Sequence, residues 1–201
     1  MTLYKSAPIY RTRRSSIGGF STVELAVSMT VLLILTAIAI PTLMRSLRAY
    51  QLNDAASRLS DMLKFTRFEA VRRNKPVCFL MQQSGSTWTL GTDSTCGGIL
   101  DTNGKQQLIS GFVGILPAGA PPSSASISST LGAASTLNTL SSSPGSIRFD
   151  ARGAVSPLAA YVLYVGSQTN PEFGYRAVIL LPSGATQIWT ASTSGPWQRI
   201  G

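Results

Sequence analysis

Gly18-Gly19-Phe20-Ser21-Thr22-Val23-Glu24 lies between a basic leader and an apolar run from Leu25 to Met44. The run contains no charged residue, and as a helix it would be about 30 Å long, enough to cross the hydrocarbon core of a bilayer. Glu24 stands at the edge of this run, where an ionisable group costs about a few kcal/mol unless it has a partner. The stretch predicts a membrane-spanning helix whose carboxylate needs a cation, and an amine is the obvious candidate.

The same stretch resembles the processing site of type IV prepilins and type II secretion pseudopilins. In both, a short basic leader ends in glycine and is followed by Phe, a glutamate and an apolar helix. The resemblance implies that prepilin peptidase removes residues 1–19 by cutting between Gly19 and Phe20, and that the new Phe20 amine is N-methylated. It also implies that Glu24 pairs with the Phe20 amine of a neighbouring subunit. Such pairing is physically reasonable because a buried carboxylate is tolerated only when it is paired.

Other interpretations of the N-terminal region stay open. A secretory signal peptide also joins basic to apolar residues, and Ala37-Ile38-Ala39 could pass as its cleavage site, although the run is long and Glu24 is misplaced for one. Arg13-Arg14 could indicate twin-arginine export, but the residues that follow lack the expected hydrophobic context. A plain single-span anchor is the remaining alternative.

Basic charge is concentrated in the first 75 of the 201 residues. Lys and Arg number 17 and Asp and Glu 8, but residues 1–19 hold four of the basic groups, which leaves 13 against 8 after cleavage. Residues 45–75 carry eight basic and three acidic groups, which is typical of a solvated helix face that could also meet acidic neighbours or DNA. The positive-inside rule places the leader in the cytoplasm and the C-terminal region outside. With the resemblance, this implies a single-pass protein of the bacterial inner membrane with a periplasmic domain.

The segment after Met44 has the spacing of an amphipathic helix. We therefore expect one helix from about Ser21 to Arg73, with residues 20–44 in the membrane or filament core and 45–75 as an amphipathic continuation. Pro41 lacks an amide hydrogen and predicts a bend or local melting. Asn74-Lys75-Pro76 predicts the helix end. The expected buried positions are Leu52, Ala56, Leu59, Leu63 and Ala70.

After Pro76 the pattern changes to short strands, so residues 76–201 predict an antiparallel β-sheet or small sandwich packed on the helix. The fold class is α+β and pilin-like. Residues 117–146 are rich in Ser, Ala, Thr and Gly and predict a long loop, with brief strands or a lid over the sheet as the alternative. The expected strands are Val77–Met81, Thr87–Leu90, Gln107–Val113, Ser146–Phe149, Tyr161–Val165, Tyr175–Leu181 and Thr186–Thr190.

Cys78 and Cys96 are the only cysteines, and both fall in the region expected to reach an oxidising compartment. A disulfide is the leading interpretation, and two separate free thiols are the alternative. A metal site is disfavoured because the chain has no histidine and so offers too few soft ligands for zinc.

Residues 63–78 also resemble the end of the long helix in the GspH/FimT family of minor pseudopilins and minor pilins. Glu69-Ala70 stands at the matching place, and residues 147–153 and 177–184 resemble the family's C-terminal strands. The resemblance implies a structural subunit that primes or caps a filament. It also implies other pilins or pseudopilins and an inner-membrane assembly platform as partners. Ala37-Ile38-Ala39-Ile40-Pro41 resembles members of type IV pili somewhat more than the H-type pseudopilins of type II secretion systems.

Two other functions have less support. Some FimT-like pilins bind DNA through a basic turn, but residues 183–187 lack arginine there, and only Arg176 and Arg199 lie near, so nucleic-acid binding is not expected. An enzyme or a bound cofactor is not expected either, because histidine is absent and no spacing suggests a catalytic pair among the few carboxylates after Pro76. Those carboxylates are Asp93, Asp101, Asp150 and Glu172.

Overall fold

The computed structural model describes residues 19–132 and 137–200. The chain divides into two compact units, residues 1–42 and 43–201, and each is described by itself. The leader up to Gly18 and residues 133–136 of the expected loop lie outside the described residues.

Helix α1 (Thr22–Arg73) runs for 52 residues, which confirms the long N-terminal helix expected from the sequence. Pro41 lies inside α1 and the helix is assigned through it, so the local melting considered above does not occur, while the bend stays a prediction. The helix ends two residues before Lys75, and Asn74 has a positive φ of 49°.

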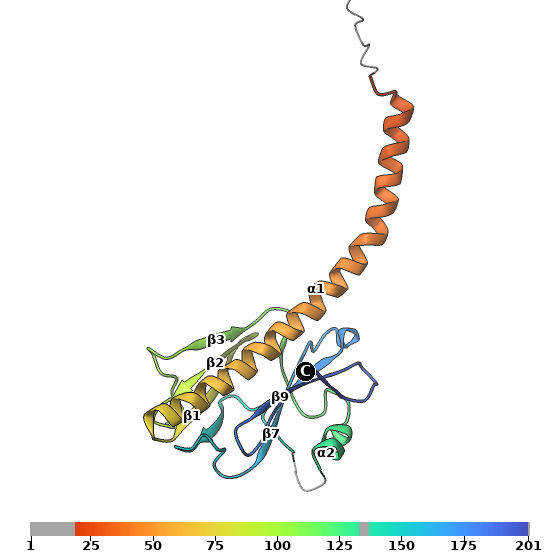
Figure 1. Ribbon diagram of the computed structural model, residues 1–201. Helices are drawn as coiled ribbons and strands as arrows, with labels where there is room; N and C mark the ends of the chain where they lie inside the picture. Colours follow the sequence, from red (N-terminus) through yellow and green to blue (C-terminus); the bar gives the residue numbers. More distant parts are fainter. Residues whose placement is uncertain (1–18, 133–136, 201) are drawn as a thin grey trace, which may run out of the picture. The chain divides into compact units, whose positions relative to one another are not determined.

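The second part of α1, residues 45–73, buries one face. Leu52, Ala56, Leu59 and Leu63 are all 0% exposed, and so is Ala70, which confirms the five positions that the spacing predicts. Outside this face, the helix carries exposed ion pairs between Arg58 and Asp54 and between Lys64 and Asp61. Within residues 43–201, this part of the helix lies across the sheets described next (Figure 1).

The first sheet has four antiparallel strands in the order β3-β2-β1-β6. Its register places Phe79 beside Ile147 and Met81 beside Leu90, on the face that packs against α1. The four strands are β1 (Val77–Ser84), β2 (Thr87–Asp93), β3 (Gln106–Ile109) and β6 (Gly145–Phe149).

The second sheet has the order β10-β9-β8-β7-β4, and β5 (Leu137–Thr139) adds a parallel pairing to β7. Its other strands are β4 (Gly114–Leu116), β7 (Ala160–Gly166), β8 (Tyr175–Leu180), β9 (Thr186–Ala191) and β10 (Gln198–Ile200). Strand β8 is buried along its whole length, which requires cover on both faces of the sheet.

Each face of the second sheet has its own apolar core. Leu163 and Val178 face α1 and the first sheet, whereas Val162 and Ile179 face a second cluster that includes Ile127 and Trp197. Because successive strand residues point to opposite faces, β7 and β8 read as nearly continuous apolar runs.

The segment 117–146 is not the loop without secondary structure that the sequence favoured. It contains the short helix α2 (Ala125–Leu131) and strand β5, which corresponds to the alternative of a lid over the sheet. The backbone N–H of Trp197 donates to Ser126 Oγ at 3.1 Å, and its indole N–H donates to the Pro122 carbonyl at 3.2 Å. The isolated apolar residues of this segment therefore cover the outer core, with Ile127 0% exposed.

The expected strand Gln107–Val113 is also corrected. Strand β3 ends at Ile109, and β4 of the other sheet begins at Gly114. Gly111 has a φ of 81°, a left-handed conformation that interrupts the strand and turns the chain toward the second sheet. The 3-10 turn Pro171–Phe173 precedes β8.

Candidate assembly site

The expected processing site lies at the start of the described residues. Gly19 and Phe20 are both exposed, and Phe20 is 80% exposed. Among the described residues, apart from its chain neighbours, no heavy atom lies within 4 Å of the position that a Cβ on Gly19 would occupy. The peptide bond between these two residues is therefore exposed in this chain.

Glu24 lies in the first turn of α1. A carboxylate is favourable there because the helix dipole places partial positive charge at the N-terminus. None of the ion pairs among the described residues includes Glu24, since they join Asp54, Asp61 and Glu69 to Lys or Arg side chains. The amine that the sequence analysis assigns to Glu24 does not exist until the Gly19–Phe20 bond is cut.

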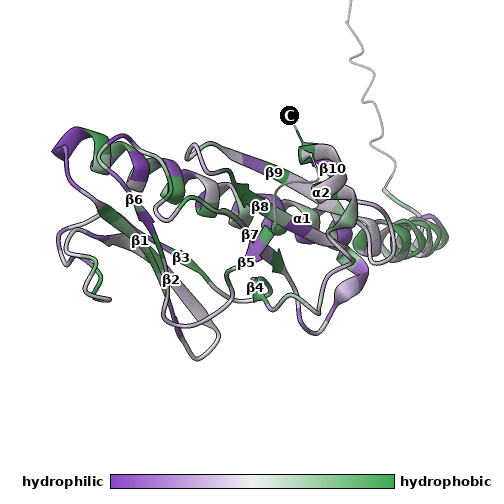
Figure 2. Cartoon of the chain, turned by 90° about the horizontal axis from the view of Figure 1, so that it is seen from below, coloured by the Kyte–Doolittle hydropathy of each residue, from purple (hydrophilic) through white to green (hydrophobic). Residues whose placement is uncertain are grey.

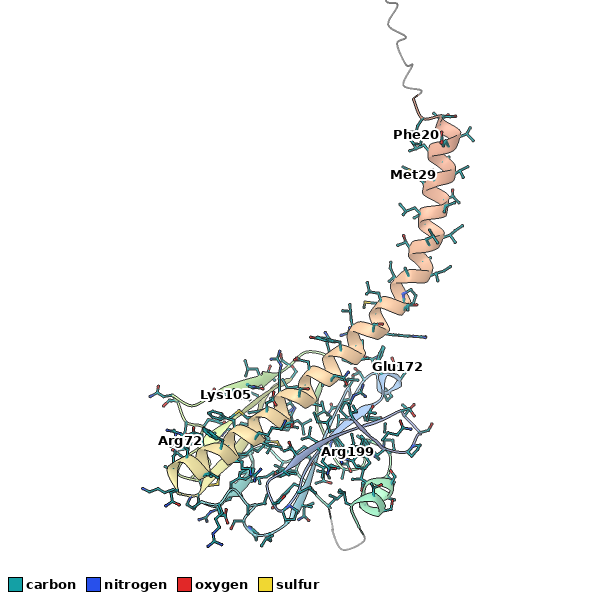
Figure 3. All side chains as sticks on the ribbon, viewed as in Figure 1. Phe20, Met29, Arg72, Lys105, Glu172 and Arg199 are labelled. Atoms are coloured by element: carbon teal, nitrogen blue, oxygen red, sulfur yellow. A yellow bond between two sulfur atoms is a disulfide. The ribbon has the colours of Figure 1, made fainter. Side chains whose placement is uncertain are left out.

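The first part of α1, residues 22–44, presents apolar side chains on every face. It lies on the one helix among the described residues that is long and apolar enough to cross a membrane, and the apolar window is entirely exposed. In Figure 3, Met29 projects from the helix and Phe20 lies just before its first residue, and Figure 2 shows most of this part as hydrophobic. Other large exposed side chains of the segment are Val23, Leu25, Val27, Val31, Leu32, Leu33, Ile34, Leu35, Ile38, Ile40, Leu43 and Met44.

Hydroxyl groups in this segment bond to the helix itself. Ser28 donates to the Glu24 carbonyl at 2.7 Å, Thr30 to the Ala26 carbonyl at 2.8 Å, and Thr36 donates to the carbonyl four residues earlier at 2.7 Å. A polar group in hydrocarbon is tolerated when its hydrogen bond is satisfied internally. These residues therefore do not interrupt the apolar surface.

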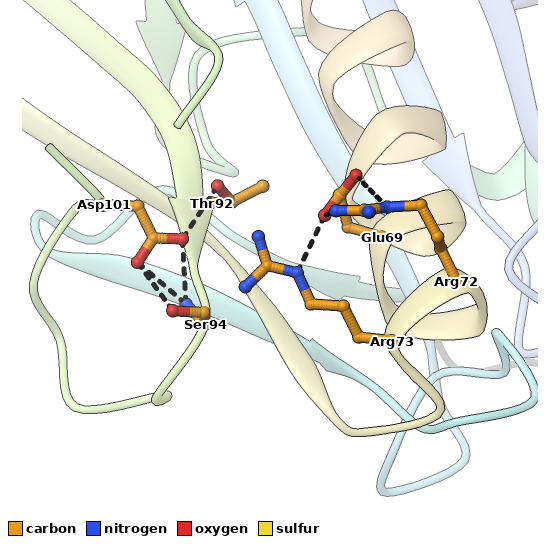
Figure 4. Close-up of polar contacts among 6 residues, drawn as sticks. All are labelled: Glu69, Arg72, Arg73, Thr92, Ser94 and Asp101. Carbon is orange, nitrogen blue, oxygen red and sulfur yellow. Dashed lines mark hydrogen bonds and ion pairs between the residues drawn. The ribbon is translucent and has the colours of Figure 1, made fainter. Parts of the chain in front are cut away.

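A second polar cluster lies at the C-terminal end of α1. The buried carboxylate of Glu69 accepts hydrogen bonds from Arg72 Nε and Nη2 at 3.0 and 2.7 Å and from Arg73 Nε at 2.8 Å (Figure 4). The hydrogen bond from Arg72, together with Arg73 and against the effect of burial, lowers the pKa of Glu69. The same contact raises the pKa of Arg72. The sequence identified Glu69 only as a family-like position, and no spacing indicated this cluster.

The predicted disulfide is present. Cys78 at the start of β1 is bonded to Cys96 in the loop after β2, and among the described residues no cysteine is free. The carboxylate of Asp93 accepts from the Thr95 side chain and from the backbone N–H groups of Thr95, Gly98 and Ile99. Burial raises the pKa of Asp93, but these hydrogen bonds together outweigh it, so the pKa is lowered overall.

The other carboxylates after Pro76 also organise turns. Asp101 accepts from Thr92 and from the backbone and side chain of Ser94, and Asp150 accepts from the backbone N–H groups of residues 152 and 154. Glu172 accepts from the Asn170 amide. Within residues 19–132 and 137–200, no group of three or more metal-ligating side chains comes together.

Arg176 is not available to an external phosphate. It is 9% exposed, its Nε donates to Asn53 of α1 at 2.7 Å, and burial lowers its pKa. The turn at Gly184 is equally occupied, because a Cβ there would lie 2.9 Å from Cδ of Arg67. Of the two arginines considered for DNA, only Arg199 is exposed.

A long helix with an apolar first part and a second part packed on antiparallel sheets is the architecture of a pilin-type subunit. A family model described as the type II transport protein GspH matches residues 55–184. Because this is more than half of the chain, the protein belongs to the GspH family, which confirms the resemblance to the GspH/FimT family seen after residue 63.

Two solved structures are similar, both of the type IV minor pilin FimU of Pseudomonas aeruginosa. The crystal form in space group P65 is 17% identical, with 72% of this chain and 97% of that chain covered and a TM-score of 0.48. The P21 form is 16% identical, with 73% and 93% covered and a TM-score of 0.50. At this identity the second match supports a shared fold. The comparison with curated protein sequences gives no match.

Proposed function

We propose that this protein is a minor pilin, a structural subunit assembled from the inner membrane into a type IV pilus after prepilin peptidase cuts between Gly19 and Phe20. The observation that carries the proposal is the first part of α1. Its apolar surface is exposed on every face, and residues 18–24 at its start resemble a prepilin processing site. Such a surface needs lipid before assembly and neighbouring helices afterwards.

The charge distribution supports a minor position rather than a bulk one. After cleavage the chain retains 13 basic against 8 acidic residues, and the excess lies mainly on residues 45–75. If copies of this chain were stacked regularly, their basic residues would repel one another. Subunits with acidic surfaces would instead be attracted to the basic residues of 45–75. We therefore place the subunit among different pilins, where it primes or caps the filament.

Intact mass and N-terminal sequencing of the protein isolated from its own cells test the proposal. We expect Phe20 as the first residue, carrying one N-methyl group, with the domain on the periplasmic side. Glu24→Gln should be processed normally but fail to enter filaments, because the carboxylate that pairs with the Phe20 amine is lost. A mature chain that begins after Ala39, or full assembly of Glu24→Gln, would refute the assignment.

A minor pseudopilin of a type II secretion system is the second candidate, and the description of the matching family model favours it. Both systems would use the same processed helix. Deleting the gene distinguishes them: loss of pili with normal protein secretion supports the pilus, and the reverse supports secretion.

A further inference from the structure

The last turn of α1 and the loop between β2 and β3 line an open surface pocket of about 470 Å³, here called the Arg73 pocket. Its wall carries one cation, Arg73, and one carboxylate, Asp101, together with neutral polar groups such as Ser94 and Asn103. Ile99 lies at the same pocket and is 74% exposed. The pocket thus combines a charged centre with an uncovered apolar side chain.

Arg73 has hydrogen-bonding capacity left over. Its Nε donates to Glu69, but its two terminal NH₂ groups form no hydrogen bond with any described residue. In Figure 4 these groups point away from Glu69, toward the side where Thr92, Ser94 and Asp101 lie. Arg72, in contrast, uses both Nε and Nη2 on Glu69 and does not line the pocket. Glu69 therefore holds the Arg73 guanidinium in place while leaving its outer edge free for a planar, two-oxygen acceptor.

Asp101 restricts which anion can bind. Its carboxylate already accepts hydrogen bonds from Thr92 and Ser94, and it forms no ion pair with Arg73 among the described residues. A small free anion would meet the negative charge of Asp101. The carboxylate of a protein segment meets the same charge, but the segment can place backbone N–H donors against Asp101 while its carboxylate binds Arg73.

The wall opposite α1 is preorganised. The disulfide with Cys78 fixes Cys96 in the loop after β2. In the same loop, the carboxylate of Asp93 accepts hydrogen bonds from the backbone N–H groups of Thr95, Gly98 and Ile99. A site held in its binding conformation loses less entropy when a partner binds.

We propose that the Arg73 pocket binds a glutamate or aspartate side chain of a neighbouring, acidic pilin-type subunit, whose carboxylate bonds to the free NH₂ groups while its adjacent surface covers Ile99. The proposal rests on the assembly function proposed above. A second copy of this chain is a poorer partner, because it brings the same basic excess on residues 45–75.

Site-specific photo-crosslinking in the full-length chain, expressed in its own cells, tests the pocket. With a photoreactive residue at Asn103, we expect a crosslink to a peptide of another pilin-type subunit that contains Asp or Glu. Arg73→Gln should lower the yield about tenfold, as expected for loss of one charge-assisted hydrogen-bonded pair. Arg72→Gln is the matched control, since it removes the same charge from the same Glu69 cluster and should retain the yield.

Equal yields from the two variants would overturn the pocket proposal, as would a crosslink only to a second copy or to a peptide without an acidic residue. Processing at Phe20 and filament incorporation are measured in the same cells. Normal processing and incorporation without the Arg73-dependent crosslink would refute the pocket alone, whereas absent processing would refute the proposed function and the pocket with it. Tryptophan fluorescence of both variants checks that the domain remains folded.

Discussion

The two parts of α1 carry apolar side chains of the same kinds in opposite situations. Leu33, in the first part, is 70% exposed, whereas Leu59, in the second, is 0% exposed. The second part finds its burial partner within the chain, on the two sheets. The first part has none among the described residues, so its burial must come from outside, from lipid or from other subunits. One continuous helix therefore contributes to folding at one end, and we propose that it serves assembly at the other.

The two glutamates of the helix repeat the contrast. Glu69 is held by two arginines of its own chain. Glu24 has no ion pair among the described residues, and the partner proposed for it belongs to another subunit. Substitutions in the second part should thus change the free energy of unfolding, and matched substitutions in the first should not.

The largest effect is expected from Leu59→Ala. Removing this fully buried side chain should lower the free energy of unfolding by about 2–5 kcal/mol, through lost transfer energy and a cavity. Leu33→Ala is the matched control and should leave it unchanged. Fluorescence-monitored unfolding in detergent reports on the domain, because Trp88, Trp189 and Trp197 are each 3–4% exposed there. Equal losses from the two variants would erase the distinction between the two parts.

Cys78→Ser should lower the free energy of unfolding by about 3 kcal/mol, since the disulfide closes a loop with a sequence separation of 18. Cleavage after Gly19 should be unaffected because that step involves the first part of α1. Cys96→Ser, at a less buried position, serves as the control and should give the same loss. Unchanged unfolding in both variants would mean that the crosslink does not stabilise the domain.

Glu69→Gln should lower the free energy of unfolding by about 1 kcal/mol at neutral pH. The effect is modest because both arginine partners are about half exposed and solvent partly screens the two ion pairs. The folded-state pKa of Glu69 is lowered, so its contribution is present above the unfolded pKa and is lost as pH falls through the folded pKa. The stabilities of wild type and variant should therefore converge below about pH 4.

Asp61→Asn is the control for Glu69→Gln. Its ion pair with Lys64 is exposed, at 3.6 Å, and should contribute little at any pH. If the difference in the free energy of unfolding between wild type and Glu69→Gln stayed constant down to acid pH, the charge of Glu69 would not be what stabilises the fold.

Local pattern was enough to predict much of the fold. The spacing of Leu52, Leu59 and Leu63 identified the buried face of α1 because a helix repeats every 3.6 residues. Strands such as β7 and β8 were visible as apolar runs. The disulfide could be inferred because both cysteines fall in the region expected to reach an oxidising compartment, where a single pairing is available.

Features that depend on distant contacts could not be predicted. Helix α2 has few apolar residues, and its place over the sheet depends on Trp197, about 70 residues away. The Arg73 pocket requires the end of α1 and the loop after β2 to meet, which no spacing in the sequence reveals. The burial of Arg176 could not be foreseen either, because its contact with Asn53 arises from packing between a strand and a helix.

The smallest expected effect comes from comparing the same side-chain hydrogen bond in an exposed and in a buried position of α1. Thr36 and Thr66 each donate to the carbonyl four residues earlier in α1, at 2.7 and 2.8 Å. Thr66 is 0% exposed and Thr36 is exposed, so the local bond is the same while its environment differs. Thr66→Val should lower the free energy of unfolding by about 0.5–1 kcal/mol, because the carbonyl keeps its backbone partner and only the side-chain bond is lost.

Thr36→Val should leave the unfolding of the domain unchanged in the same fluorescence assay. Because the first part of α1 finds its burial partner only in lipid or other subunits, any effect of this change belongs to insertion or assembly, which pull-down of the variant with isolated filaments would measure. If Thr36→Val destabilised the domain as much as Thr66→Val, the two parts of α1 would have to unfold as one cooperative unit, and burial alone would no longer explain why they differ.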